Sequence, residues 1–257
     1  MSKKEGLGKL KSKLVCLKNL VLKGVKRFSD CLFPLNLTCN LCGKEVFDGQ
    51  SLCENCREKI VKNDGFICAT CGRKVPLLME RCFSCKGNWS VDLARSAFVY
   101  ESEIQTLIKR YKYGNARYLA DIFVEELKTL YIKNAFFADT VCGVPMTKER
   151  VYERGFNQSE YLAEKLAEAL GINYRPLLVK RRETDRQAGL TFSERVKNLS
   201  GCFVVADSKT VSGKNVLIVD DVLTTGSTSD EIGRVLKKAG AKHVALLTVA
   251  STTPETF

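Results

Sequence analysis

Residues 216–228 are the organising element of this chain, and they read Val216-Leu217-Ile218-Val219-Asp220-Asp221-Val222-Leu223-Thr224-Thr225-Gly226-Ser227-Thr228. The first four are apolar and predict a buried strand, which leaves the core at the two acids. After the loop of Thr and Gly, apolar residues at helical spacing predict a helix that stops at Gly240. Backbone N–H groups and the helix dipole converge at such a junction, so residues 224–228 are predicted to bind a phosphate.

The two carboxylates beside this loop need a ligand of their own. Carboxylates accept hydrogen bonds in pairs, so Asp220 and Asp221 could hold the two vicinal hydroxyls of a ribose whose phosphate lies in the loop. The alternative is a strand end with solvated acids, followed by a capped helix. The complete pattern of residues 216–228 favours the ribose phosphate site.

Eight of the twelve cysteines form four CxxC pairs in two halves, and the second half repeats the first at an offset of 29 residues. The pairs are Cys39 and Cys42, Cys53 and Cys56, Cys68 and Cys71, and Cys82 and Cys85. CxxC turns supply two thiolates each to tetrahedral zinc, and Gly43 and Gly72 suit the positive φ of such turns. Each half is too short to hold a core without metal, so we expect two structural zinc ions.

The sequence leaves open which pairs share an ion. Core burial of the eight cysteines and thiol redox chemistry are the alternatives to zinc. The cysteines outside the pattern, Cys16, Cys31, Cys142 and Cys202, are expected to be buried thiols.

The chain has 257 residues, 45% of them hydrophobic, and a formal charge of +12, of which +7 lies in residues 1–38. This size permits one main domain and a smaller one, and the charge favours an acidic partner, with nucleic acid as the first candidate. No cleavable leader or membrane span is evident, so we expect the protein in the cytoplasm. The predicted domains are a basic tail at 1–30, a double zinc ribbon at 31–88 and the main domain at 93–257.

Residues 7–28 place leucines, valines and a phenylalanine at intervals of three and four, with lysines on most of the other face. They predict a basic amphipathic helix. It could make peripheral contact with anionic lipid, dock a partner helix or cover its own domain.

The main domain is predicted to alternate strands and helices. Strands are expected at 96–100, 140–144, 177–180, 202–206, 216–219 and 244–249, in one α/β sheet, with helices at 104–112, 116–131 and 156–170. At the end of the first helix, Lys109, Arg110, Lys112 and Tyr113 alternate basic and aromatic side chains. They could contact a nucleic-acid backbone and stack on bases, or simply end a helix whose tyrosines pack.

Residues 216–228 resemble, position by position, the phosphoribosyl pyrophosphate (PRPP) loop of type I phosphoribosyltransferases. Over residues 31–250 the chain also resembles the ComF family of competence proteins. The motifs that carry this second resemblance are the cysteine pairs, Val144-Pro145, Arg154-Gly155-Phe156-Asn157-Gln158, Gln187, Glu194-Arg195 and Asn198.

These resemblances imply a type I phosphoribosyltransferase-like parallel sheet flanked by helices, with a small N-terminal zinc-ribbon domain whose metal sites each have four cysteine ligands. The loop at 148–154 would receive pyrophosphate through Arg150 and Arg154, and residues 181–198 would close over PRPP. Asp220 and Asp221 would be catalytic, stabilising an oxocarbenium-like transition state, with Mg2+ bound to PRPP. Residues 222–228 would bind the ligand: Val222, Leu223, Thr224, Thr225, Gly226, Ser227 and Thr228.

The ComF resemblance further implies a role in DNA uptake and natural transformation, with single-stranded DNA and a DNA-translocation helicase as partners. A metabolic phosphoribosyltransferase of nucleotide synthesis or salvage and a nucleotide-sensing regulator are the alternatives, and catalytic activity stays open. Thr224 stands where purine-salvage members of the superfamily have an Asp, which argues against hypoxanthine or guanine as acceptor.

Overall fold

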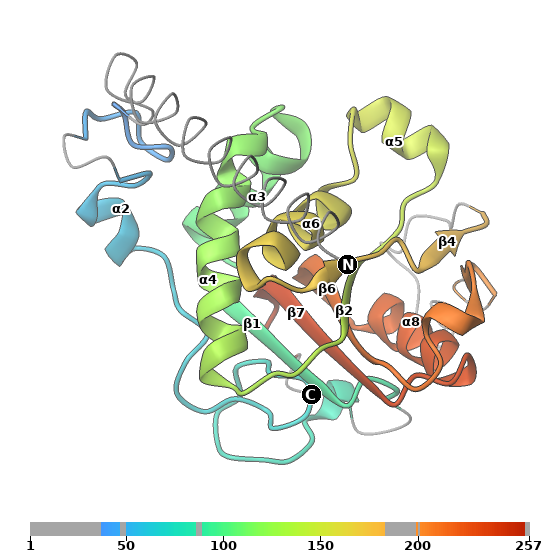
Figure 1. Cartoon of the computed structure of the whole chain (residues 1–257). Coiled ribbons are helices and arrows are strands. Elements are labelled where there is room, and N and C mark those ends of the chain that lie inside the picture. The colour runs from blue at the N-terminus through green and yellow to red at the C-terminus, as the bar shows by residue number, and fades with distance from the viewer. Residues whose placement is uncertain (1–36, 47–49, 86–88, 183–198, 200, 255–257) are drawn as a thin grey trace, which may run out of the picture. The chain divides into compact units, whose positions relative to one another are not determined.

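Figure 1 shows a computed structural model of the chain, which describes residues 37–46, 50–85, 89–182, 199 and 201–254. The predicted helix at 7–28, Cys16 and Cys31 lie outside these residues, as does most of the predicted closing segment 181–198. The chain divides into two compact units, Met1–Arg57 and Glu58–Phe257. In the described part, no helix is both long and apolar enough to cross a membrane.

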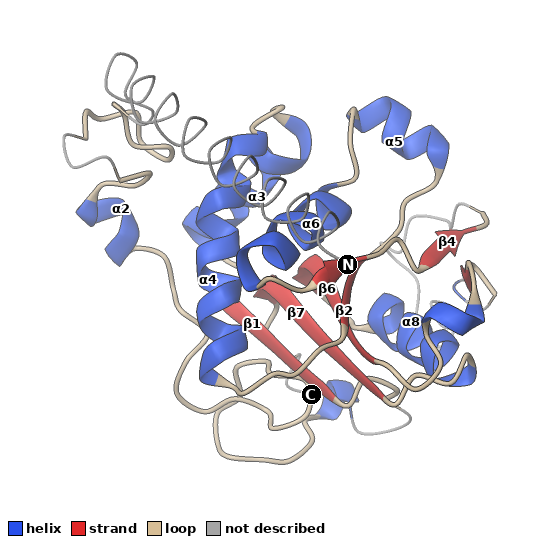
Figure 2. Ribbon diagram, in the orientation of Figure 1, coloured by secondary structure: helices blue, strands red, loops and turns tan. Residues whose placement is uncertain are grey.

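The larger unit is built on a five-stranded parallel sheet with the order β1-β7-β6-β2-β3 (Figure 2). Its strands are β1 Leu93–Val99, β2 Thr140–Gly143, β3 Asn173–Tyr174, β6 Asn215–Leu223 and β7 His243–Ser251. Residues 216–219 are fully buried in β6, as a central strand of a helix-covered parallel sheet requires. The predicted α/β class and the buried strand at 216–219 are confirmed.

The main helices are α3 Ser102–Tyr113, α4 Ala120–Lys133, α6 Gln158–Leu170 and α8 Ser227–Lys238. Helix α8 packs against the sheet face that carries Val216 and Ile218, while α4 packs on β1 and β7 and α6 on β2 and β6. Helix α6 begins where the Asn157 side chain accepts hydrogen bonds from the first-turn N–H groups, and it ends at Gly171 in the left-handed conformation. The Asn157 cap fixes the end of α6 that carries Gln158 and Ser159 and faces the candidate site.

Two segments differ from the predicted single sheet. Residues expected as strands at 177–180 and 202–206 instead form a separate antiparallel pair, β4 Leu178–Lys180 and β5 Phe203–Val205. The physical reason is their length and pattern. Each strand has three residues, and Val179 is 47% exposed, so one face of the pair is open to solvent. Antiparallel strands tolerate a solvent-exposed face, whereas parallel strands are usually covered on both faces.

The predicted loop at 148–154 is instead the short helix α5 Lys148–Arg154. Gly155 ends it in the left-handed conformation, with a φ of 84°, and no α5 side chain is buried. The exposed face explains why no apolar period marks this helix in the sequence. The remaining short elements are α2 Glu54–Glu58, η1 Phe83–Cys85, η2 Arg117–Leu119 and η3 Ser208–Thr210.

Candidate functional site

The junction between β6 and α8 has the strand–loop–helix geometry predicted from the sequence. The strand ends at Leu223, and Gly226 adopts a φ of 88° so that the chain can turn into α8 at Ser227. An L side chain at position 226 would be strained in this conformation. The hydroxyls of Thr225 and Ser227 lie 3.1 Å apart inside the turn, and the first N–H groups of α8 lack helical partners. This is a suitable place for an anion.

Three polar side chains from other elements hold the acidic pair in β6. Ser159 Oγ donates to Asp220 Oδ1 at 2.6 Å, and Gln158 Nε2 donates to Asp221 Oδ2 at 2.8 Å. Lys112 Nζ, from the end of α3, lies 2.8 Å from Asp221 Oδ1. Asp221 is only 4% exposed, so its charge depends on Lys112 for compensation.

Burial and neighbouring charges shift the pKa values of Asp220 and Lys112. Burial, followed by the charge of Asp221, raises the pKa of Asp220 to about 7. Burial alone would lower the pKa of Lys112, but the charges of Asp221 and Asp220 and the hydrogen bond to Asp221 outweigh it and raise that pKa. Lys112 therefore stays protonated at neutral pH, whereas Asp220 titrates near neutrality.

The acidic pair lines a pocket of about 240 Å³ together with the cations of α5. The lining residues are Val144, Pro145, Met146, Arg150, Arg154, Gln158, Ser159, Lys180, Leu199, Phe203, Asp220, Asp221 and Thr228. The structure thus brings Arg150 and Arg154 together with the acids, as the sequence interpretation required. Among residues 222–228, Thr228 lines this pocket, whereas the side chain of Leu223 is buried in the core.

Arg154 joins this pocket to α3. Its Nη1 donates to Gln158 Oε1 at 2.6 Å, its Nη2 donates to Tyr113 Oη at 3.2 Å, and its guanidinium lies over the Tyr113 ring. Gln158 therefore bridges Arg154 and Asp221. The sequence pattern assigns no role in the site to Gln158, although this residue lies in the Arg154–Gln158 motif. It likewise does not predict that Ser159 and Lys180 line the pocket.

The basic and aromatic run at the end of α3 divides between interior and surface. Tyr111 is fully buried, donates to the Gln158 carbonyl at 2.8 Å and packs edge-on against Phe123. Lys112 points to the acidic pair, while Lys109 and Arg110 are exposed. Tyr111 is therefore a core residue of the larger unit. Lys109 and Arg110 are the exposed cations of this run, and they can contact a ligand.

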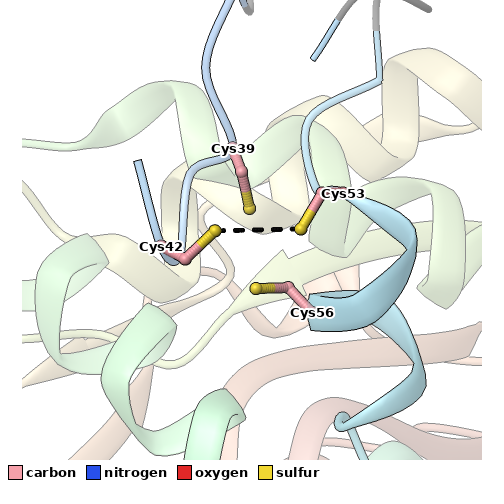
Figure 3. A group of neighbouring side chains, drawn as sticks. All are labelled: Cys39, Cys42, Cys53 and Cys56. Atoms are coloured by element: carbon pink, nitrogen blue, oxygen red, sulfur yellow. Dashed lines mark hydrogen bonds between the residues drawn. The ribbon is translucent and has the colours of Figure 1, made fainter. Parts of the chain in front are cut away.

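The first cysteine cluster lies in the smaller unit. Cys39, Cys42, Cys53 and Cys56 point toward one another, with their Sγ atoms within 4.8 Å (Figure 3). Leu41 N–H donates to Cys39 Sγ at 3.5 Å, and Gly43 has the predicted positive φ of 74°. Four soft ligands at this spacing, with the Leu41 N–H directed at one of the sulfurs, form a structural zinc site with no ligand place left open.

The second cluster repeats this arrangement within the larger unit. The Sγ atoms of Cys68, Cys71, Cys82 and Cys85 also lie within 4.8 Å of one another, and all four residues are buried. Consecutive pairs therefore share each site, which the sequence had left open. Because this cluster belongs to the larger unit, the division at Arg57 falls inside the predicted zinc domain, whose boundaries stay a prediction. Cys142 and Cys202 are buried outside both clusters, as expected.

Comparison with known proteins supports both the zinc ribbon and the phosphoribosyltransferase-like domain. Residues 28–87 match the double zinc ribbon domain, and residues 157–255 match the phosphoribosyl transferase domain. Competence protein F of Haemophilus influenzae is 31% identical over 202 residues, covering 75% of this chain and 87% of that protein. Competence protein ComFC of Bacillus subtilis is 28% identical, with 78% and 84% covered. DNA utilization protein YhgH of Escherichia coli K12 is 29% identical, with 80% and 93% covered.

Proposed function

This chain belongs to the ComF family of competence proteins, and from that premise we propose that it acts in DNA uptake by binding a phosphoribosyl ligand and single-stranded DNA. The observation that carries the ligand proposal is the pocket that unites the acidic pair with Arg150 and Arg154. A ligand with two hydroxyls and phosphate groups at two positions matches this distribution of charge. PRPP has that chemistry.

Different residues of the pocket bind different groups of the ligand. The carboxylates of Asp220 and Asp221 accept hydrogen bonds from the ribose hydroxyls. Ser159 Oγ and the Asp221 N–H both donate to Oδ1 of Asp220, which leaves Oδ2 for the ligand. Each Asp221 oxygen retains a second lone pair beside Gln158 or Lys112. The loop at 224–228 and the start of α8 receive the 5-phosphate, and the α5 arginines receive pyrophosphate.

The two carboxylates also offer the hard oxygen ligands that Mg2+ prefers, so the pocket fits this ion. When bound there with PRPP, this ion would supply positive charge against the leaving pyrophosphate. The acids of β6 stabilise positive charge that develops on the ribose ring, which is what phosphoribosyl transfer requires of the protein.

Calorimetric titration with PRPP tests the ligand assignment. Changing Asp220→Asn together with Asp221→Asn removes two hydrogen bonds to charged acceptors, each contributing about 1.5 kcal/mol or more, so affinity should fall about 100-fold. Lys133→Met, an exposed change at the end of α4, is the matched control. Equal affinity of the double variant and the wild type would contradict the site assignment.

The proposal for single-stranded DNA is supported by an aromatic–basic surface made of Lys109, Arg110, Tyr113 and Tyr118. Tyr113 is 74% exposed and Tyr118 50% exposed, and Arg110 Nη2 donates to Tyr118 Oη at 3.4 Å. Lys109 and Tyr113 lie one helical turn apart on α3, on the same face. Exposed aromatic rings beside cations suit single-stranded DNA, because its bases can stack on the rings while its phosphates form ion pairs with Lys109 and Arg110.

Fluorescence anisotropy with a labelled oligothymidylate and a matched duplex tests this surface. Binding should favour the single strand and weaken with salt, and Lys109→Met should reduce the slope of log affinity against log salt by about 0.7. Tyr113→Ala with Tyr118→Ala should remove the preference for single strands. Absence of binding at low salt by the zinc-loaded protein would leave a phosphoribosyltransferase or a nucleotide sensor as the better description. A DNA-translocation helicase stays a predicted partner.

A further inference from the structure

One arginine of the second zinc ribbon is buried with no carboxylate partner among the residues that the structure describes. Arg73 is 0% exposed, and among the described residues it forms no ion pair with an Asp or Glu. A guanidinium cannot lose its proton in a protein, and an uncompensated buried charge is strongly unfavourable. An anion must therefore lie close to it.

The two ends of the Arg73 fork contact two different sites. Nη1 donates to Cys71 Sγ at 3.6 Å, and Nη2 donates to the Thr224 carbonyl oxygen of the phosphate loop. Four thiolates around one Zn2+ carry a net charge of −2, which supplies the missing anion. The planar fork of arginine can hold both acceptors at once, whereas the ammonium of lysine acts as a compact point charge.

A second contact supports the same junction. A Cβ at Gly226 would lie 2.6 Å from the Trp89 ring, so Trp89 packs directly against the phosphate loop. Ser90 N–H donates to Asp230 Oδ1 in the first turn of α8 at 2.7 Å. Trp89 also packs against both the second cysteine cluster and the main core. The phosphate loop therefore contacts the zinc ribbon through the hydrogen bond from Arg73, and it packs on the ring of Trp89, which follows the ribbon in the chain.

From these contacts we infer that Arg73 is a positioning residue through which zinc in the second cluster holds the phosphate loop in its binding conformation. Metal occupancy of this cluster therefore sets the affinity for phosphorylated ligands. The inference rests on the proposed phosphoribosyl function of the loop. When the metal leaves, the charge that compensates Arg73 is lost, and so is the brace on Thr224.

Arg73→Met tests this in the zinc-loaded full chain, with Arg81→Met as an exposed control on the same ribbon. We expect amide hydrogen exchange at 224–228 to rise at least tenfold without ligand, PRPP affinity to fall 10- to 100-fold, and zinc to pass faster to a chromogenic chelator. Arg73→Lys keeps the charge but not both bonds, so it should be intermediate in all three. Arg81→Met should match the wild type.

Unchanged exchange and unchanged affinity in Arg73→Met would overturn the inference and leave the proposed function intact. If the wild type itself bound no PRPP, the proposed function would fail, and the exchange measurement would still decide the role of Arg73. Should Arg73→Met not fold, chelator treatment of the wild type replaces it. Exchange at 224–228 must then rise more than exchange in α6, and equal rises in both segments would count against the brace. Trp89 is the only tryptophan, so its emission reports the same change.

Discussion

Replacing Lys112 by Met removes the cation that compensates Asp221 and should destabilise the larger unit strongly. Loss of one partner of a buried ion pair costs about 3–5 kcal/mol, because the other charge stays behind unpaired. Lys112 keeps 20% of its side chain exposed and Asp221 keeps 6%, so water offsets part of this loss. We expect about 2–3 kcal/mol, which is a fall in Tm of roughly 5–10 °C.

The stability lost in Lys112→Met should also depend on pH, and the titration of Asp220 sets the direction of this dependence. Its pKa is raised by burial and by Asp221 from 3.8 to about 7, so between these values the folded state binds more protons than the unfolded state. Stability therefore falls as pH rises through this window. Without Lys112 the repulsion between the two carboxylates grows, so the deficit of Lys112→Met should be larger at pH 8 than at pH 5.5.

Urea unfolding followed by far-UV circular dichroism measures this effect, and Lys109→Met on the exposed face of the same helix is the matched control. Adding Asp221→Asn to Lys112→Met should recover much of the lost stability, since the residual charge is then gone. If Lys112→Met and Lys109→Met unfolded at the same urea concentration, the ion pair would carry no stability. The account of the acidic pair would then be wrong.

Three further predictions concern the zinc ions and Asp220. Metal analysis of the reduced chain should find two zinc ions, one for each cluster of four cysteines, and a value below about 1.5 would contradict the ligand sets. Cys82→Ser should lose one ion and lower the stability of the larger unit, as seen in thermal unfolding. Asp220→Asn should be more stable than the wild type above pH 7, with the difference vanishing near pH 4; a constant difference across this range would exclude the raised pKa of Asp220.

The sequence was sufficient where the pattern is local. The strand, loop and helix at 216–228 are contiguous, and their apolar run, acids and glycine each have one physical reason. The cysteine pairs were equally clear, because ligand spacing is a local property. The assignment of pairs to each ion was not, since it depends on how two turns fold against each other.

Long-range contacts could not be predicted from any single stretch. Lys112, Gln158 and Asp221 come from α3, α6 and β6, and only the three-dimensional fold brings these side chains together. The bond from Arg73 to Thr224 joins residues 151 positions apart. The short strands β4 and β5 look like sheet strands by composition, and their antiparallel pairing outside the main sheet is a tertiary outcome.

Phosphorus NMR of PRPP with Mg2+ and the zinc-loaded protein distinguishes which phosphate lies at which element. Binding should shift the 5-phosphate resonance, and Thr225→Val should remove this shift while the α5 arginines still perturb the pyrophosphate resonances. A pyrophosphate shift without any change at the 5-phosphate would contradict the placement of the phosphoribosyl group at residues 224–228.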